Sequence, residues 1–226
     1  MKKTPIIVTS IVIAFLALGY LLYKVSPPPV SALELKYYDL SQAKKIDQPV
    51  EVSSDDHILG NPSAKNTIVA YEDIQCPACR SFKPILEQLP TALTDTKLVF
   101  RHFPLYPSPH PNSLAAAYAS EAASAQGKFW EFTDLLYERQ EDWADLANPL
   151  DKFVEIAQTA GVLDTAKFKA DILASKYEPK IEKDNMEGAG LGVNATPTIF
   201  FNSHKLVLKQ GTLDEIKSLV EPYYIK

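Results

Sequence analysis

Two cysteines, Cys76 and Cys79, are separated by two residues and are the only cysteines of the chain. Such a pair suits thiol–disulfide exchange, in which one thiolate attacks through a mixed disulfide and a nearby thiol resolves it. A structural disulfide here would close a very short loop and remove little chain entropy. Zinc needs further ligands, and His102 and His110 lack zinc-finger spacing. The pair therefore predicts redox chemistry without a metal.

A predicted strand and a predicted helix flank this pair. Residues 67–70 form an apolar, partly β-branched run that is typical of a buried strand, and residues 71–75 form the junction. Cys76 then lies at a helix N-terminus, where unsatisfied N–H groups and the helix dipole favour a thiolate. We expect Cys76 to be the exposed nucleophile and Cys79, one turn inward, the resolving thiol. Apolar residues at helical spacing support this helix: Phe82, Ile85, Leu86 and Leu89.

The remaining elements define a fold. Residues 97–103 predict a second strand, and residues 197–201 and 205–208 predict a hairpin that turns through 202–204. Residues 213–220 predict a closing amphipathic helix. The segments between are predicted to be helical: 114–126, 129–137, 149–161, 164–175 and 179–187. The order indicates an α/β thioredoxin fold with an all-helical domain, at about 112–190, inserted between its halves.

Several motifs, taken in chain order, resemble exported DsbA-like thiol–disulfide oxidoreductases of bacteria, over about residues 56–223. The resemblance implies the same fold and, in Thr196-Pro197, a cis-proline loop that faces the active site and pairs with an extended peptide. The alternative is an ordinary proline at a strand start. The motifs are Asp56-His57-Ile58-Leu59-Gly60-Asn61-Pro62, Ile68-Val69, Asp73-Ile74-Gln75-Cys76-Pro77-Ala78-Cys79, Arg101-His102-Phe103-Pro104-Leu105, His110-Pro111-Asn112, Gly127-Lys128-Phe129-Trp130-Glu131 and Ala195-Thr196-Pro197-Thr198.

The residues around the cysteines depart from the family in two respects. Pro77 and Ala78 are the predicted redox-tuning positions, and the most oxidising members of the family have a histidine where Ala78 stands. The resemblance therefore implies a milder oxidant. The superfamily often has a buried acid six residues before the first cysteine, as a proton relay, but this chain has Ala70 there. Glu72, on the same strand parity, and Asp73 are the candidate relays.

The four histidines, in contrast, form no recognisable catalytic motif with a serine or an acid. We predict that they are structural: His57, His102, His110 and His204.

The N-terminal segment predicts export and anchoring. Lys2 and Lys3 precede an apolar stretch at 6–23, which is long enough to span a bilayer, and Lys24 follows. A cleaved signal peptide is the alternative, but its only small-residue site, at 17–19, lies inside the apolar run. We expect an uncleaved transmembrane helix in residues 1–25 with a cytoplasmic N-terminus and an extracytoplasmic remainder.

Beyond the anchor we expect a proline-rich spacer and then the catalytic domain. Residues 26–54 begin with Pro27-Pro28-Pro29, which favours an extended conformation. Residues 30–54 are either a lead-in packed on the domain or a stalk. The thioredoxin-like domain is predicted at 55–226.

Composition and motifs together predict a function. The net charge of −5 and the lack of a basic run argue against nucleic-acid binding. We expect a membrane-anchored oxidoreductase that donates disulfides to exported proteins through Cys76-Pro77-Ala78-Cys79, with no cofactor or metal. The resemblance implies reoxidation by a quinone-linked membrane partner. A reductase or isomerase using the same cysteines, or a non-catalytic peptide-binding domain, are the alternatives.

Overall fold

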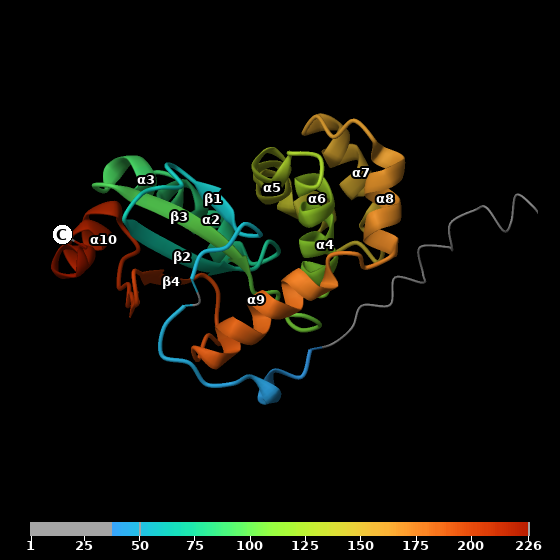
Figure 1. The fold of residues 1–226 in the computed structure, drawn as a ribbon. Helices are drawn as coiled ribbons and strands as arrows, with labels where there is room; N and C mark the ends of the chain where they lie inside the picture. Colours follow the sequence, from blue (N-terminus) through green and yellow to red (C-terminus); the bar gives the residue numbers. More distant parts are fainter. Residues whose placement is uncertain (1–37, 50, 226) are drawn as a thin grey trace, which may run out of the picture. The chain divides into compact units, whose positions relative to one another are not determined.

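A five-stranded mixed sheet forms the centre of the fold (Figure 1). The computed structural model describes residues 38–49 and 51–225, so the predicted anchor lies outside the described residues. Within them, no helix is both long and apolar enough to cross a membrane. The strand order is β1-β3-β2-β4-β5, with β2 and β3 parallel and the other neighbours antiparallel. The strands are β1 (His57–Leu59), β2 (Asn66–Glu72), β3 (Thr96–His102), β4 (Thr198–Phe201) and β5 (His204–Lys205).

The apolar run of β2 is continuous because both faces of the sheet are covered. Ile68 and Ala70 point to one core, and Val69 and Tyr71 point to the other. Helices α2, α3 and α10 contribute to the first core, whereas the residues around α9 contribute to the second. These helices are α2 (Pro77–Leu86), α3 (Leu89–Ala92), α9 (Glu178–Gly190) and α10 (Leu213–Val220).

A group of helices follows β3 in the chain, and the chain returns from it to the sheet through α9 (Figure 1). At the centre of the group is α4, whose residues are nearly all buried and half of which are alanine. Small side chains on every face let α5, α7, α8 and α9 all contact this one helix. The helices are α4 (Ser113–Ser124), α5 (Phe129–Glu138), α6 (Gln140–Trp143), α7 (Leu150–Thr159) and α8 (Thr165–Leu173).

Two glycines let α9 pack closely on both sides. A Cβ at Gly188 would lie 2.7 Å from the ring of Phe103, below any ordinary contact distance. A Cβ at Gly190 would lie 2.3 Å from the carbonyl oxygen of Lys44, in the segment before the sheet. The N–H of Ile46 also donates to the carbonyl of Gly190, at 3.1 Å. The described part of the segment, residues 38–49, is therefore a packed lead-in and not a stalk.

The predicted order of elements is confirmed, with a few differences in detail. The sequence pattern did not predict the three-residue strand β1 or the short helices α3 and α6. The second hairpin strand was predicted to extend to residue 208, whereas β5 ends at Lys205. The turn between β4 and β5 includes Asn202 in the left-handed region, at φ 52°. The α/β thioredoxin fold with a helical insert is thus correct.

Candidate active site

The first cysteine lies where the sequence predicted it. Cys76 is the N-cap residue of α2, with φ −70° and ψ 122°, and Pro77 follows at the first helical turn. Cys79 lies one turn further along, and both cysteines are free thiols. Cys76 is less exposed than predicted, since only 6% of its surface is accessible; Cys79 is fully buried. Cys76 is still the thiol that an incoming sulfur reaches first.

Neutral donors stabilise the thiolate of Cys76. Its pKa is lowered to about 5, most strongly by a hydrogen bond from the Cys79 thiol, and partial burial opposes this shift. The Thr196 side chain also lowers the pKa. The backbone N–H groups of Cys79 and Ala78 add to the effect. The sequence predicted the backbone contribution, but it gave no sign of the two side-chain donors.

The second predicted site segment lies directly against Cys76. The Thr196-Pro197 peptide bond is cis, as the resemblance implied. The carbonyl oxygen of Thr196 accepts from Cys76 Sγ at 3.4 Å. Strand β4 begins at the next residue, Thr198, so the central sheet fixes this loop. Pro77 and Ala78 are exposed beside the sulfur, where a binding partner can contact them.

Glu72 is the acid that approaches Cys79. It lies at the end of β2, is buried, and accepts a hydrogen bond from Tyr137 Oη at 3.1 Å. Burial raises the Glu72 pKa to about 8. The Cys79 pKa is raised well above its ordinary value by burial, then by the contact with Cys76 and the charge of Glu72. Glu72 is thus coupled to the resolving thiol and has a pKa close to neutral.

Asp73 has a different position from Glu72. Its carboxylate accepts from the N–H groups of Gln75 and Leu105, both at 2.8 Å, and lies 2.6 Å from Nδ1 of His110. These bonds join the loop before Cys76 to the loop that follows β3. With its carboxylate occupied in this way, Asp73 is less suited than Glu72 to relay a proton.

His110 is a residue whose position the sequence did not reveal. The bond to Asp73 is the main cause of its raised pKa, and the nearby Cys76 thiolate contributes. His110 belongs to one of the sequence motifs that resemble the known family, but we predicted only a structural role for it. A cleft beside the cysteines has this histidine in its wall, and its other lining residues include Gln75, Pro77, Arg80, Gln140 and Glu141.

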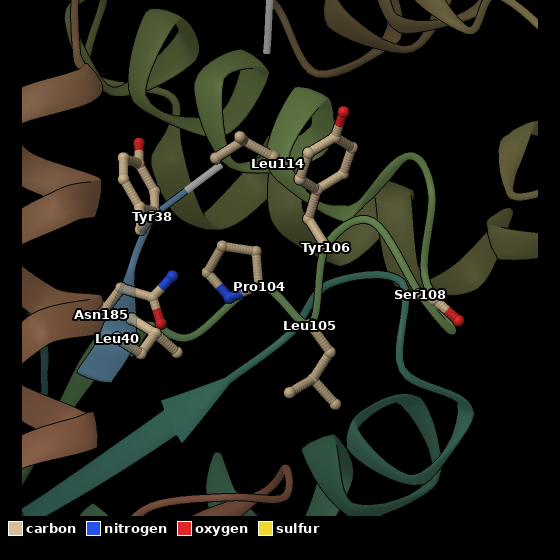
Figure 2. A pocket seen from close by; sticks show the side chains of 8 residues that line it. All are labelled: Tyr38, Leu40, Pro104, Leu105, Tyr106, Ser108, Leu114 and Asn185. Carbon is tan, nitrogen blue, oxygen red and sulfur yellow. The ribbon is translucent and has the colours of Figure 1, made fainter. Parts of the chain in front are cut away.

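A separate pocket lies between the lead-in, the loop after β3, α4 and α9 (Figure 2). The buried Oδ1 atom of Asn185 has no hydrogen-bond partner among the described residues. Neither cysteine lines the pocket, so it is not part of the redox site. The lining residues are Tyr38, Leu40, Pro104, Leu105, Tyr106, Ser108, Leu114 and Asn185.

The fold and this site define a thioredoxin-like protein: an activated thiol, a buried partner thiol and a cis-proline loop lie together in a thioredoxin fold. The profile of the family described as Thioredoxin matches residues 52–222. The chain therefore belongs to the thioredoxin family.

Solved structures of known proteins have a similar fold. A thioredoxin-like oxidoreductase from Silicibacter pomeroyi is 26% identical, with a TM-score of 0.61 over 75% of this chain and 92% of that one. Oxidised BdbD from Bacillus subtilis is 24% identical, with a TM-score of 0.66 over 80% and 98%. Chlamydia trachomatis DsbA is 18% identical, with a TM-score of 0.60 over 73% and 88%. The last two, at this identity, show the fold alone.

Curated relatives match a longer stretch of sequence but carry a different name. The Na(+)/H(+) antiporter NhaA 1 of Mycolicibacterium gilvum is 34% identical over 203 residues, which is 86% of this chain and 29% of that protein. The protein named Na(+)/H(+) antiporter NhaA in Herminiimonas arsenicoxydans is 32% identical over 91% of this chain and 30% of its own length. This chain thus spans less than a third of these relatives.

Proposed function

We propose that this protein donates disulfides to exported proteins from the extracytoplasmic side of a membrane to which its N-terminal segment anchors it. The observation that supports the oxidising direction is the Cys76 pKa of about 5. A thiolate stabilised in this way favours the reduced pair over the disulfide, and so makes the disulfide a better oxidant. The value lies between about 3.5 for the strong oxidant DsbA and about 7 for thioredoxin.

The reaction moves two electrons from a client dithiol to the Cys76–Cys79 pair. A client thiolate attacks Cys76 Sγ of the disulfide, the Cys76–Cys79 bond breaks, and Cys79 leaves as a thiolate. A second client thiolate then attacks the client sulfur of the mixed disulfide, and Cys76 leaves as the stabilised thiolate. The client gains a disulfide and the protein is left reduced.

Proton transfer to Cys79 completes the first step. The raised Cys79 pKa means that this sulfur takes up a proton as soon as it leaves. Glu72, with a pKa of about 8, is protonated at pH 7 and can supply that proton. The Glu72 carboxylate recovers its proton from water. Glu72 thereby takes the role of the buried proton-relay acid that the superfamily often has at the position of Ala70.

The client backbone binds beside the sulfur. The cis Thr196-Pro197 loop is held next to Cys76 by β4, which supports pairing with an extended client segment. The cleft lined by Pro77, His110 and Glu141 offers space for client side chains on the other side. Reoxidation of the reduced pair is assigned in this proposal to a quinone-linked membrane partner.

The full-length protein in detergent tests the direction of the reaction. We expect a reduction potential between about −120 and −270 mV, measured against glutathione, because the Cys76 pKa is intermediate. We also expect oxidation of a reduced, unfolded client protein. Cys76→Ser and Cys79→Ser should each abolish this activity, because neither variant can form the internal disulfide that accepts the two electrons of the client.

Other results would point to the alternatives. A potential near about −270 mV, with reduction of client disulfides, would support a reductase. Failure to exchange thiols in any assay would support a non-catalytic peptide-binding domain. Recovery of a mature chain that begins after Gly19 would contradict the membrane anchor.

A further inference from the structure

Three potential metal ligands form a cluster that does not include either cysteine. His57 on β1, His102 on β3 and Glu121 on α4 place one ligand atom each within 4.8 Å of the others. Glu121 Oε1 is 2.7 Å from His57 Nε2 and 2.9 Å from His102 Nε2. The redox reaction uses none of these side chains, so the cluster needs its own explanation.

The three side chains offer donor atoms that metal ions bind in proteins, two imidazole nitrogens and one carboxylate oxygen. Burial lowers the pKa of His102. Burial alone would raise the Glu121 pKa, but the bonds from His102 and His57 hold it well below its usual range. Asp184 and Lys180 on α9 are the other charged groups that act on His102, with opposite effects.

The surroundings hold the rings in place and leave one way in. His57 stacks on Phe129 with ring centroids 3.4 Å apart, and His102 meets the edge of Phe100 at 5.0 Å. The backbone N–H of His102 donates to Asp184. His102 is 1% exposed and Glu121 6%, whereas His57 is only partly buried and lies next to solvent. An ion could enter past His57.

We propose that His57, His102 and Glu121 bind one divalent transition-metal ion, with Zn²⁺ as the ion that fits best. Two imidazole nitrogens and one carboxylate oxygen are a donor set of zinc, and they leave a fourth position for water. Binding at Nε2 requires each ring to carry its proton on Nδ1, and the ion then replaces the two hydrogen bonds to Glu121. The ion would connect the edge strand β1 and strand β3 to α4, and so the sheet to the helical insert.

Metal titration of the full-length protein tests the site. The background is Cys76→Ser with Cys79→Ser, so that no thiol can bind the ion, and metal is first removed with EDTA. We expect one equivalent of Zn²⁺ to bind, to raise the unfolding temperature by mass action, and to shift the ¹⁵N resonances of Nε2 in His57 and His102. Co²⁺ should give absorption bands typical of nitrogen and oxygen ligands.

Variants separate this site from other histidines. His57→Gln should weaken Zn²⁺ binding at least tenfold, while Gln can still donate to Glu121. His204→Gln is the matched control: His204 stacks on Tyr223 at 3.8 Å on the exposed strand β5, and its loss should leave the affinity unchanged.

The parent is the protein with both cysteines replaced by serine and no further change. The proposal would be overturned if this parent did not bind Zn²⁺, or bound Zn²⁺ without a shift of both histidine resonances. Equal binding by His57→Gln and the parent would also overturn it. The resonance shifts are measured on the parent, so they decide the matter even if a variant does not fold.

Discussion

Two buried polar regions of this protein stabilise charged side chains in different ways. At the cysteines, the donors that lower the Cys76 pKa most are all neutral. At the second region, which we term the junction network (Asp56, Tyr71, Arg101 and Glu187), opposite charges are paired. Arg101 donates to Asp56 at 3.0 and 3.1 Å and also to Glu187, which accepts from Tyr71 at 2.6 Å.

The presence or absence of a counter-ion determines how readily a buried charge reacts. A buried ion in an ion pair is held in place, because removing either partner leaves the other as an unpaired buried charge. The Cys76 thiolate is stabilised mainly by neutral dipoles, so no direct ion pair has to be broken before it reacts. The junction network thus stabilises the connection between β3 and α9, whereas the cysteine pair keeps its charge available for chemistry.

The largest expected effect follows from breaking the junction network. Arg101→Met should lower the free energy of unfolding by about 3–5 kcal/mol, because the carboxylates of Asp56 and Glu187 remain buried without their partner. Urea unfolding measures the change. The matched control is Arg139→Met, whose ion pairs with Asp142 and Glu155 lie at the surface and should be worth at most about 1 kcal/mol. Equal losses in the two variants would contradict the comparison.

The next effect concerns Glu72, which is buried without such pairing. Its pKa is raised to about 8 from 4.5, so between these pH values the folded state binds more protons than the unfolded chain. The stability that Glu72 contributes is therefore complete below about pH 4.5 and is lost as the pH rises through 8. Glu72→Gln should remove this loss and gain a few kcal/mol at pH 9.

Unfolding midpoints of the parent and of Glu72→Gln, measured from pH 4 to 9, test this prediction. The two curves should diverge only above about pH 4.5. Parallel curves would mean that Glu72 is ionised in the folded protein. The same variant should also slow the release of Cys79 in exchange with a client.

A smaller effect isolates the main neutral donor. Cys79→Ala removes the S–H group that contributes most to the lowered pKa of Cys76, whereas Cys79→Ser keeps an O–H donor. We expect the Cys76 pKa to be at least about one unit higher in the alanine variant than in the serine variant. Thiolate absorbance against pH gives both values. If they coincide, the backbone and Thr196 alone account for the shift.

The smallest effect is at Ala78, which is exposed. A histidine here would add a positive charge or a donor near the Cys76 sulfur, but solvent screens it. Ala78→His should lower the Cys76 pKa by less than about one unit and raise the potential by up to about 30 mV, the equivalent of 1.4 kcal/mol. An unchanged potential would show that this position does not set the oxidising strength.

Local signals explain what the sequence revealed. Three sequence signals each lie within a few residues of the chain. They are the spacing of Cys76 and Cys79, the apolar run of β2 and the proline of Thr196-Pro197. They were enough to predict the order of elements and the N-terminal position of Cys76 on α2, whereas the cis-proline loop was predicted from the resemblance to a known family. The two-sided burial of β2 also follows from its continuous apolar run.

Contacts between distant residues explain what stayed hidden. His57 and Glu121 are 64 residues apart, and no spacing rule links them. Thr196 lies against Cys76 because strand β4, which begins two residues later, pairs with β2. Strand β1 is too short for a hydrophobic period, so pairing with β3 defines it. The close contacts of the glycines of α9, with Phe103 and with the lead-in, arise only in the folded protein, so the local sequence did not reveal them.

The two edge strands, β1 and β5, are three and two residues long. Unfolded chains at high local concentration tend to add to an open sheet edge, and this is how co-aggregation begins. Edges this short offer such chains few free N–H and C=O groups, and both residues of β5 are exposed and polar. Under the proposed function, in which the protein binds unfolded clients, such short edges protect it from being recruited into aggregates of those clients.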